Sequence, residues 1–209
     1  MSRKTKEEAE KTRARILASA LSLFVRKGYE HTTFTDIAAR LKMTKGAVYW
    51  HFATKEELLN ALVGEMIERF QRQLGDLPAE ELTFLSVAET MVARAERITD
   101  DPKGAAFFLL LQTQVKWEAD SMAAMRERLM ARDMKGPYHC FIRAVENDIA
   151  AGRVRADVNP VAIASVGMSV WTGLVRAKID KFLECDLAET LRKTYDAMWR
   201  SIRRGEGER

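Results

Sequence analysis

Apolar residues recur every three to four positions along most of the chain, and polar residues fill the positions between them. This spacing gives a helix one apolar face, whereas a half-buried strand needs strict alternation, which no stretch sustains. The pattern therefore predicts an all-α protein. Its first four helices carry these apolar positions: Ile16, Ala20, Leu23 and Phe24; Ile37, Ala38 and Leu41; Ala47, Val48 and Phe52; and Leu58, Leu59, Leu62, Met66 and Phe70.

Capping residues and helix breakers set the expected helix bounds. Thr5, Thr33, Thr44 and Thr54 stand where N-caps belong, and Gly28 is a natural end for the first helix. Beyond Pro78 the pattern predicts helices over 80–99, 103–117, 121–151, 160–183 and 187–204. Gly136-Pro137 should interrupt or kink the helix that contains it.

The most informative segment is 33–52, where two short helices are joined by a turn through Lys42-Met43. This is a helix-turn-helix arrangement, whose second helix can enter the major groove of DNA. Two short helices and a turn also occur in many helical proteins, and the aromatic residues could belong to a core. The DNA contacts predicted from the second helix are Thr44, Lys45, Gly46, Tyr49, Trp50 and His51.

The residues around this segment add further predicted contacts. Lys55 lies in the first turn of the next helix, where its ammonium and the free amides favour a phosphate. Thr33, at another helix start, can donate to DNA from its hydroxyl and its amide. The basic lead, with Arg3, Lys4 and Lys6, could cross the backbone or enter the minor groove.

Charge is unevenly distributed along the 209 residues. Residues 1–55 hold 12 Lys and Arg against 5 Asp and Glu, whereas the other 154 residues hold 22 against 25. A basic first quarter on a nearly neutral body indicates a polyanionic partner for that segment. A well-solvated helix surface explains the charge equally well, so charge alone does not decide between them.

The sequence also resembles a known family. The residues that carry the resemblance run from Ile16-Leu17 through Gly28-Tyr29, Thr32-Thr33 and Ile37-Ala38 to the run Thr44–Phe52 and Lys55-Glu56-Glu57-Leu58. They resemble the DNA-binding domain of TetR/AcrR-type transcriptional repressors, and the opening from Arg3 is similar to the branch that represses multidrug efflux operons. The resemblance is dense over residues 3–62 and weak beyond residue 75.

The resemblance implies an N-terminal three-helix DNA-binding domain, 1–55, followed by a helical ligand-binding and dimerisation domain, 56–209. It implies a homodimer paired through the helices at about 160–183 and 187–204. The first of these is apolar nearly all round, so it must be covered on more than one side. A helix buried within a monomer would have the same composition.

Pocket residues are harder to predict. An apolar site with a few polar groups suits a lipophilic or aromatic effector, yet ordinary core is the commoner role for each candidate. The candidates are Phe107, Phe108, Leu111, Gln112, Val115, Trp117, His139, Cys140, Met168, Trp171 and Thr172.

The sequence gives little support to an enzyme, a metalloprotein or a membrane protein. The three histidines, His31, His51 and His139, lie far apart and match no metal-binding or nucleophile motif, so we expect no enzyme activity, metal or cofactor. Cys140 and Cys185 form no disulfide framework, and Cys140 could be a redox-sensing thiol or a small core residue. No apolar run reaches the ~20 residues of a membrane span and no secretory signal is visible, so we expect a cytoplasmic protein without a membrane partner.

The sequence therefore predicts a dimeric repressor that binds a palindromic DNA operator and is released by a small lipophilic or aromatic effector, with a multidrug efflux operon as its target. The alternative is a helix-turn-helix regulator without a small ligand, which answers to a protein partner or activates transcription. A ligand-free protein would be expected to have a filled C-terminal core.

Overall fold

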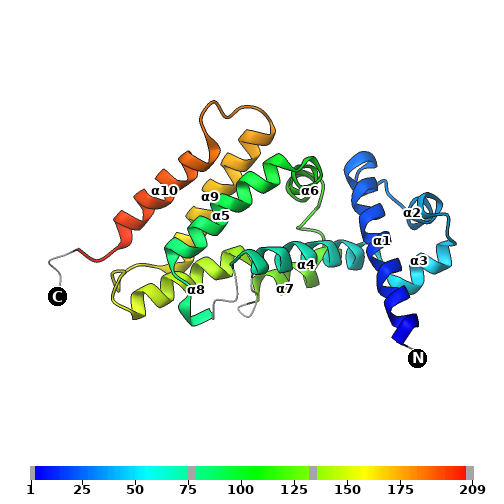
Figure 1. Cartoon of the computed structure of the whole chain (residues 1–209), viewed down its shortest axis with the longest axis horizontal. Coiled ribbons are helices and arrows are strands. Elements are labelled where there is room, and N and C mark those ends of the chain that lie inside the picture. Colours follow the sequence, from blue (N-terminus) through cyan, green and yellow to red (C-terminus); the bar gives the residue numbers. More distant parts are fainter. Residues whose placement is uncertain (1–2, 75–78, 132–135, 206–209) are drawn as a thin grey trace. The chain divides into compact units, whose positions relative to one another are not determined.

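The computed structural model describes residues 3–74, 79–131 and 136–205. Over these ranges the secondary structure is helical, apart from one isolated bridge between Val154 and Arg203, so the all-α prediction is confirmed (Figure 1). The elements are α1 (Arg3–Lys27), α2 (Phe34–Leu41), α3 (Lys45–His51), α4 (Lys55–Leu74), η1 (Ala79–Glu81), α5 (Phe84–Asp100), α6 (Pro102–Thr113), η2 (Asp120–Met122), α7 (Ala123–Met130), α8 (Pro137–Ala150), α9 (Pro160–Ile179) and α10 (Leu187–Ile202).

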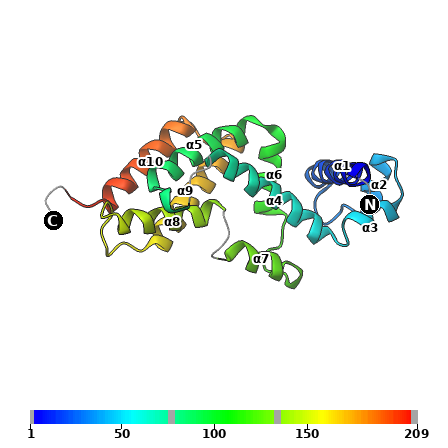
Figure 2. The same cartoon turned by 60° about the horizontal axis from the view of Figure 1, so that its bottom comes forward.

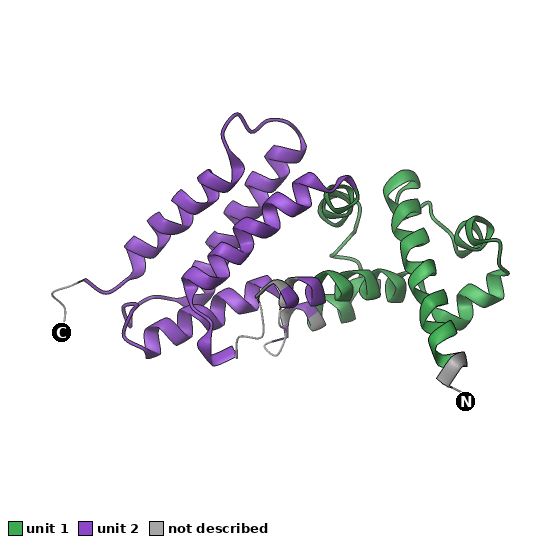
Figure 3. Ribbon diagram, viewed as in Figure 1, with its two compact units in different colours: residues 1–66, 103–128 green, residues 67–102, 129–209 purple. Residues whose placement is uncertain are grey.

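The chain forms two compact units, drawn in different colours in Figure 3. Unit 1 contains residues 1–66 and 103–128, and unit 2 contains residues 67–102 and 129–209. The predicted boundary at 55/56 divides the chain differently, because the first part of α4 and most of α6 belong with the N-terminal helices. Helix α4 is apolar on the side that packs in unit 1, where Leu58, Leu59, Leu62 and Val63 are buried.

In unit 1 the first three helices pack around one small core, and we call α1–α3 the three-helix head. The threonine caps that the sequence predicts at two of its helices are confirmed. Thr33 and Asp36 form a reciprocal capping box at α2, and the Thr44 side chain accepts the Ala47 N–H at the start of α3. The core residues of the head are Ile16, Leu17, Ala20, Leu23, Phe24, Phe34, Ile37, Ala38, Val48 and Phe52.

The turn between α2 and α3 reverses the chain without a glycine. Lys42 takes the left-handed conformation, with φ 54° and ψ 45°. Its N–H donates to the Ala39 carbonyl at 3.2 Å, and the Met43 N–H donates to the Ala38 carbonyl at 3.0 Å. These two bonds satisfy carbonyls that the end of α2 would otherwise leave unpaired, and so fix where α3 begins.

In unit 2, helices α5, α8, α9 and α10 pack against one another, and α9 and α10 lie side by side in both views (Figures 1 and 2). An aromatic cluster fills their common core, with ring centroids 5.7 Å apart for Phe84 and Phe141 and 6.3 Å apart for Phe84 and Tyr195. Gly167 lies against this cluster, and a Cβ there would be in ordinary contact with Tyr195 and Met198, at 3.6 Å each. The Tyr195 hydroxyl donates to the Gly167 carbonyl at 3.4 Å.

A buried carboxylate in unit 2 accepts hydrogen bonds from the start of α5 and from the loop after α8. Asp148 is fully buried on α8, and its oxygens accept the Phe84 N–H at 2.8 Å and the Arg153 guanidinium at 2.6 Å. The first bond caps the N-terminus of α5 and the second holds the loop after α8. Because both oxygens are paired, the charge is compensated in a place where an isolated carboxylate would be costly.

Several predicted helix bounds need correction. The first helix begins at Arg3, so Thr5 lies inside it and the predicted cap there is wrong; the preceding residues are ordinary helix formers that extend the helix by two residues. The predicted helix 121–151 is broken into α7 and α8, and Pro137 occupies the first turn of α8, as a proline without an N–H can. Helix ends elsewhere differ by a few residues.

Helix α9 is long and apolar, although no uninterrupted apolar run of ~20 residues occurs in the sequence. It is the one described helix long and apolar enough to span a membrane by length and composition, because its small hydroxyl residues interrupt the apolar run without adding charge. Only 22% of the window that meets this test is buried inside the structure. Much of the apolar surface of α9 is therefore uncovered in a single chain.

The turn after α1 generates the first testable prediction. Gly28 has φ +93°, and a Cβ there would lie 3.4 Å from the Gln114 side chain. Changing Gly28→Ala should lower the free energy of unfolding by about 1–2 kcal/mol, since side chains resist this backbone region. Gly64 of α4 has open space around it, so Gly64→Ala should instead raise stability by about 0.5–1 kcal/mol. Urea unfolding measures both changes in the free energy of unfolding, provided that the m-value does not change. A Gly28→Ala variant as stable as wild type would contradict the left-handed conformation of Gly28.

Candidate nucleic-acid interface

The start of α3 presents a compact polar surface. Thr44 is the N-cap, and its hydroxyl oxygen accepts the Ala47 N–H at 3.2 Å. Lys45 and Gly46 follow as the first two helical residues, and both are exposed. A Cβ added to Gly46 would meet only the Thr44 hydroxyl, at 3.9 Å, so another molecule can approach the backbone closely here.

The two aromatic residues in the middle of α3 point outward. Tyr49 is 48% exposed and packs its ring edge against buried Phe34, with centroids 4.8 Å apart. The Lys45 ammonium lies over the Tyr49 ring at 5.4 Å from its centroid. Phe34 thus holds Tyr49 in place, and Tyr49 in turn orients Lys45, so the cation is directed before any partner binds.

Trp50 is 70% exposed, which is unusual for the largest apolar side chain. Its ring lies perpendicular to that of His51, with centroids 4.6 Å apart. Exposed tryptophan and tyrosine beside a lysine form a surface with both apolar and cationic character. Such a surface can contact thymine methyl groups, sugars and phosphates together.

Arg13 of α1 adds a cation that the sequence reasoning missed. Its guanidinium lies over the ring of buried Phe52, 5.0 Å from the centroid, close to the C-terminal end of α3. Partial burial and then the charge of Arg13 lower the pKa of His51 below its usual 6.5. The helical spacing of α1 could have indicated Arg13. This residue lies one turn before Ile16 and Leu17 and so shares the face of α1 on which these two residues are buried.

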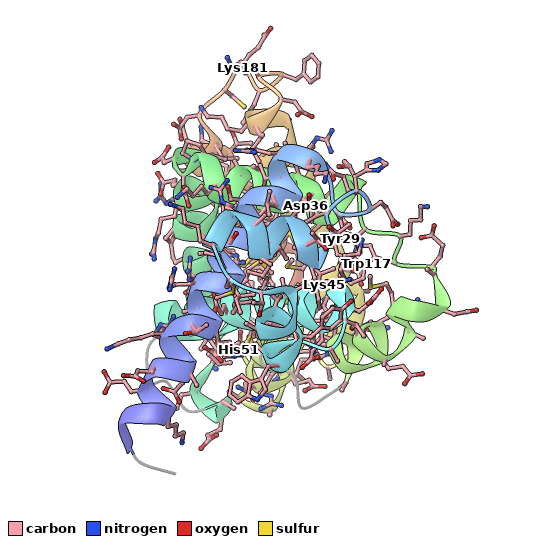
Figure 4. All side chains as sticks on the ribbon, turned by 90° about the vertical axis from the view of Figure 1, so that its right-hand side faces the viewer. Tyr29, Asp36, Lys45, His51, Trp117 and Lys181 are labelled. Atoms are coloured by element: carbon pink, nitrogen blue, oxygen red, sulfur yellow. The ribbon has the colours of Figure 1, made fainter. Side chains whose placement is uncertain are left out.

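Figure 4 shows this head with Asp36, Lys45 and His51 labelled, and Asp36 changes the interpretation of Thr33. Both donors that the sequence assigns to a phosphate, the Thr33 hydroxyl and its N–H, donate to the Asp36 carboxylate at 2.7 and 2.8 Å. The Lys27 ammonium also donates to Asp36, at 2.7 Å. The bond from Lys27 and then those from Thr33 lower the pKa of Asp36 to about 2. Thr33 is thus a helix cap, and a phosphate contact would require these bonds to open.

Lys55 also differs from the expectation. Its ammonium donates to the carbonyls of Tyr29 and Glu30, at 3.0 Å each, and lies 4.8 Å from the centroid of the Tyr29 ring. Two of its three donors are therefore directed at the turn between α1 and α2, because carbonyls at the end of that turn have no helical partner. The structure gives Lys55 a positioning role, which leaves one donor for a phosphate.

The basic lead is described in part. Arg3 and Lys4 begin α1, but their side chains lie outside the described residues; Lys6 is exposed on the same helix. Their contacts with DNA stay predictions.

The predicted effector residues fall in both units. In unit 1, Phe107, Phe108, Leu111 and Val115 are buried, Gln112 is exposed, and the Trp117 indole donates to the Leu111 carbonyl at 2.8 Å. In unit 2, Cys140 and Trp171 are buried, and the Trp171 indole donates to the Met91 carbonyl at 2.8 Å. The remaining three, His139, Met168 and Thr172, are half-buried. Within the described ranges no three His, Cys, Asp or Glu residues gather as metal ligands.

Comparison with known proteins identifies the head. Residues 16–62 match the family described as bacterial regulatory proteins, tetR family. These residues are therefore similar to the tetR family. This segment includes the α2-turn-α3 arrangement and the start of α4, which are the parts of the structure that present the exposed residues above.

Curated tetR-family relatives match mainly through the head. The regulator TtgR of Pseudomonas putida is 47% identical over 68 residues, which are 32% of each chain. The probable acrEF/envCD operon repressor of Escherichia coli is 30% identical over 138 residues, which are 62% of this chain and 60% of that protein. The chain thus spans between a third and three fifths of the length of these relatives. Both are named as regulators of transcription.

Solved structures share the fold along most of the chain. NalD, the secondary repressor of the MexAB-OprM efflux pump in Pseudomonas aeruginosa, has a TM-score of 0.71 and is 23% identical, with 95% of this chain and 98% of that chain covered. A complex of SmeT with triclosan has a TM-score of 0.72 and is 20% identical, with 93% of each chain covered. At these identities the likeness shows the fold of both domains, an N-terminal helix-turn-helix domain and a C-terminal helical domain.

His51 generates the second prediction. Burial and Arg13 hold its pKa below the usual value, so it is neutral in the free protein at pH 7 to 8. A DNA phosphate beside it would raise that pKa, so binding should take up a proton and strengthen as the pH falls from 8 to 6, by up to about tenfold per pH unit. In His51→Gln this rise should vanish. Exposed His31 is the control, because His31→Gln should keep the rise. A pH dependence unchanged in His51→Gln would contradict the assignment.

Proposed function

We propose that the protein is a dimeric transcriptional repressor that binds a palindromic operator through α3 and is released by a small lipophilic or aromatic effector. The observation that carries the proposal is the outer face of α3, where Lys45, Gly46, Tyr49 and Trp50 are all exposed beside the Thr44 cap. A major groove about 12 Å wide accepts a helix, and these residue types suit its edges and its phosphates. The target genes are proposed to be a multidrug efflux operon, because the relatives NalD and SmeT are named as repressors of such pumps.

The dimer is proposed from the uncovered face of α9. Val161 and Val166 on this helix are 48% and 52% exposed, and Ala162, Ser165, Ser169 and Gly173 are exposed with them. Small residues let two helices approach closely, and a second copy related by two-fold symmetry would cover the same face on both chains. Helix α10 packs beside α9 and would complete the contact. Two heads would then each read one half of an inverted repeat.

The effector is proposed from residue chemistry and from the triclosan complex of SmeT. Helix α6 in unit 1, and helices α8 and α9 in unit 2, each carry aromatic or aliphatic residues of the kind that suits a bulky apolar molecule. Such a molecule acts on DNA binding only through its different affinity for two states of the protein. A regulator that answers to a protein partner, or that activates transcription, remains the alternative, and screening for release from DNA separates it. A site of action in the cytoplasm follows from this proposal, since that is where the DNA is.

The third prediction tests DNA binding itself. The full chain should select an inverted repeat from random duplex DNA, with an affinity that falls steeply as salt rises. Lys45→Ala should weaken binding and reduce the slope of log binding constant against log salt concentration by about one, because one phosphate contact is lost. Exposed Arg97 on α5, also a cation, is the matched control. Fluorescence anisotropy at several salt concentrations measures both.

Three results would count against this account. They are selection of no DNA at low salt, enrichment of a single half-site only, and an equal loss in Lys45→Ala and Arg97→Ala. Triclosan can then be tested on the selected duplex as the first candidate effector, since SmeT binds it. Release of the protein at micromolar triclosan would support the ligand-responsive proposal over the alternative.

The fourth prediction concerns the α9 face. Val166→Asp places a charge on the proposed contact, so the variant should sediment as a monomer at micromolar concentration while its helical circular dichroism persists. Leu85→Asp is the control, because Leu85 is a comparably exposed apolar residue, 47% exposed, on α5; this variant should sediment as a dimer. A wild-type chain that is monomeric and binds lipid vesicles would show that a membrane, rather than a second copy, covers α9.

A further inference from the structure

The segment 28–33 joins α1 to α2, and the backbone of its first turn, Gly28 to Glu30, is held by three separate parts of unit 1. The Gly28 carbonyl accepts the Thr32 hydroxyl at 2.7 Å, within the segment itself. The carbonyls of Tyr29 and Glu30 accept the ammonium of Lys55, from the first turn of α4. The Tyr29 N–H donates to the side-chain oxygen of Gln114 at 3.2 Å. Gln114 directly follows the last residue of α6.

Gln114 is itself held in place by the end of α6. Its N–H donates to the Leu110 carbonyl at 2.9 Å, and three residues later the Trp117 indole donates back to the Leu111 carbonyl at 2.8 Å. Tyr29 and Trp117 are both labelled in Figure 4. A second contact between the same two segments is the ion pair of Lys116 with Glu30, at 3.8 Å, but both of its side chains are more than half exposed, so it is weak.

The side chain of Tyr29 is buried beneath this turn. Tyr29 is 3% exposed, its ring packs edge-on against Phe24 at 5.0 Å, and its hydroxyl has no hydrogen-bond partner in the described structure. The Lys55 ammonium lies over the same ring, 4.8 Å from its centroid. An unpaired buried hydroxyl is costly, so the bonds to the backbone of this turn help to hold the Tyr29 side chain in its buried position.

We propose that the Gln114–Tyr29 bond is a latch that couples the end of α6 to the three-helix head and keeps α2 and α3 positioned for DNA. Gln114 is a positioning residue, because it touches the turn and lies on no surface assigned to DNA. Three residues after the turn, Thr33 caps α2, so a shift of the Tyr29 peptide is carried directly into α2 and, through their shared core, into α3. The DNA consequence rests on the proposed function, whereas the latch itself does not.

The test compares two changes at one position in the full-length chain. Gln114→Leu removes the acceptor, and Gln114→Glu keeps an oxygen at the same reach. Hydrogen exchange of the Tyr29 amide, followed by NMR, should quicken at least tenfold in Gln114→Leu and stay near the wild-type rate in Gln114→Glu. Gln114 is exposed, so neither change should affect the fold. Unchanged exchange in Gln114→Leu would overturn the latch, whether or not the chain binds DNA.

The second arm uses the duplex that the wild-type chain selects. Gln114→Leu should weaken binding about tenfold with the same salt dependence as wild type, since no phosphate contact is lost; Gln114→Glu should restore it. Quicker exchange at Tyr29 with unchanged affinity would show a latch that does not reach DNA, and would overturn the coupling. A smaller salt dependence in Gln114→Leu would show instead that Gln114 is itself near the phosphates, and would overturn its positioning role.

Discussion

The Lys55 ammonium fixes the turn that leads from α1 into α2, and the candidate DNA surface of α3 depends on that turn. Lys55 reaches back from the start of α4 to two backbone carbonyls in the turn after α1. Apolar packing between α1, α2 and α3 is non-directional and would tolerate small rotations, whereas hydrogen bonds to a charged donor fix angle and distance. Lys55 therefore supplies directional interactions that the apolar packing of α1, α2 and α3 lacks. Everything that α3 presents to a partner depends on where this turn holds α2.

The surface around α3 is arranged in advance by aromatic rings. Buried Phe34 orients Tyr49, exposed Tyr49 orients Lys45, and buried Phe52 supports the guanidinium of Arg13. Tyr49, Lys45 and Arg13 are thus each held by a neighbouring ring. Side chains already held in place lose less conformational entropy on binding, so more of their interaction energy appears as affinity. The same supports explain why large aromatic residues can remain exposed here.

Sequence patterns within a few residues predicted the fold well. They could not predict polar contacts between residues far apart in the sequence. The caps at Thr33 and Thr44, Gly28 and the break at Gly136-Pro137 follow from rules that act within a few residues, and the structure confirms them. Lys55 was predicted to face a phosphate, because nothing in the sequence shows that the carbonyls of Tyr29 and Glu30 lie within its reach. Gln114 is 85 residues from its partner, and Arg13 looked like any surface arginine. The candidate DNA surface on α3 was predictable because a cap and a helical period determine its outer face.

The central claim is that α3 enters DNA, and hydroxyl-radical oxidation of the protein tests it most directly. Trp50, on α3, and Phe182, in the loop after α9, are both highly exposed aromatic side chains, at 70% and 82%. The oxidation rate of each is measured by mass spectrometry with and without the selected duplex. The account predicts that DNA protects Trp50 severalfold and leaves Phe182 unchanged. Equal oxidation of Trp50 in both states would contradict it.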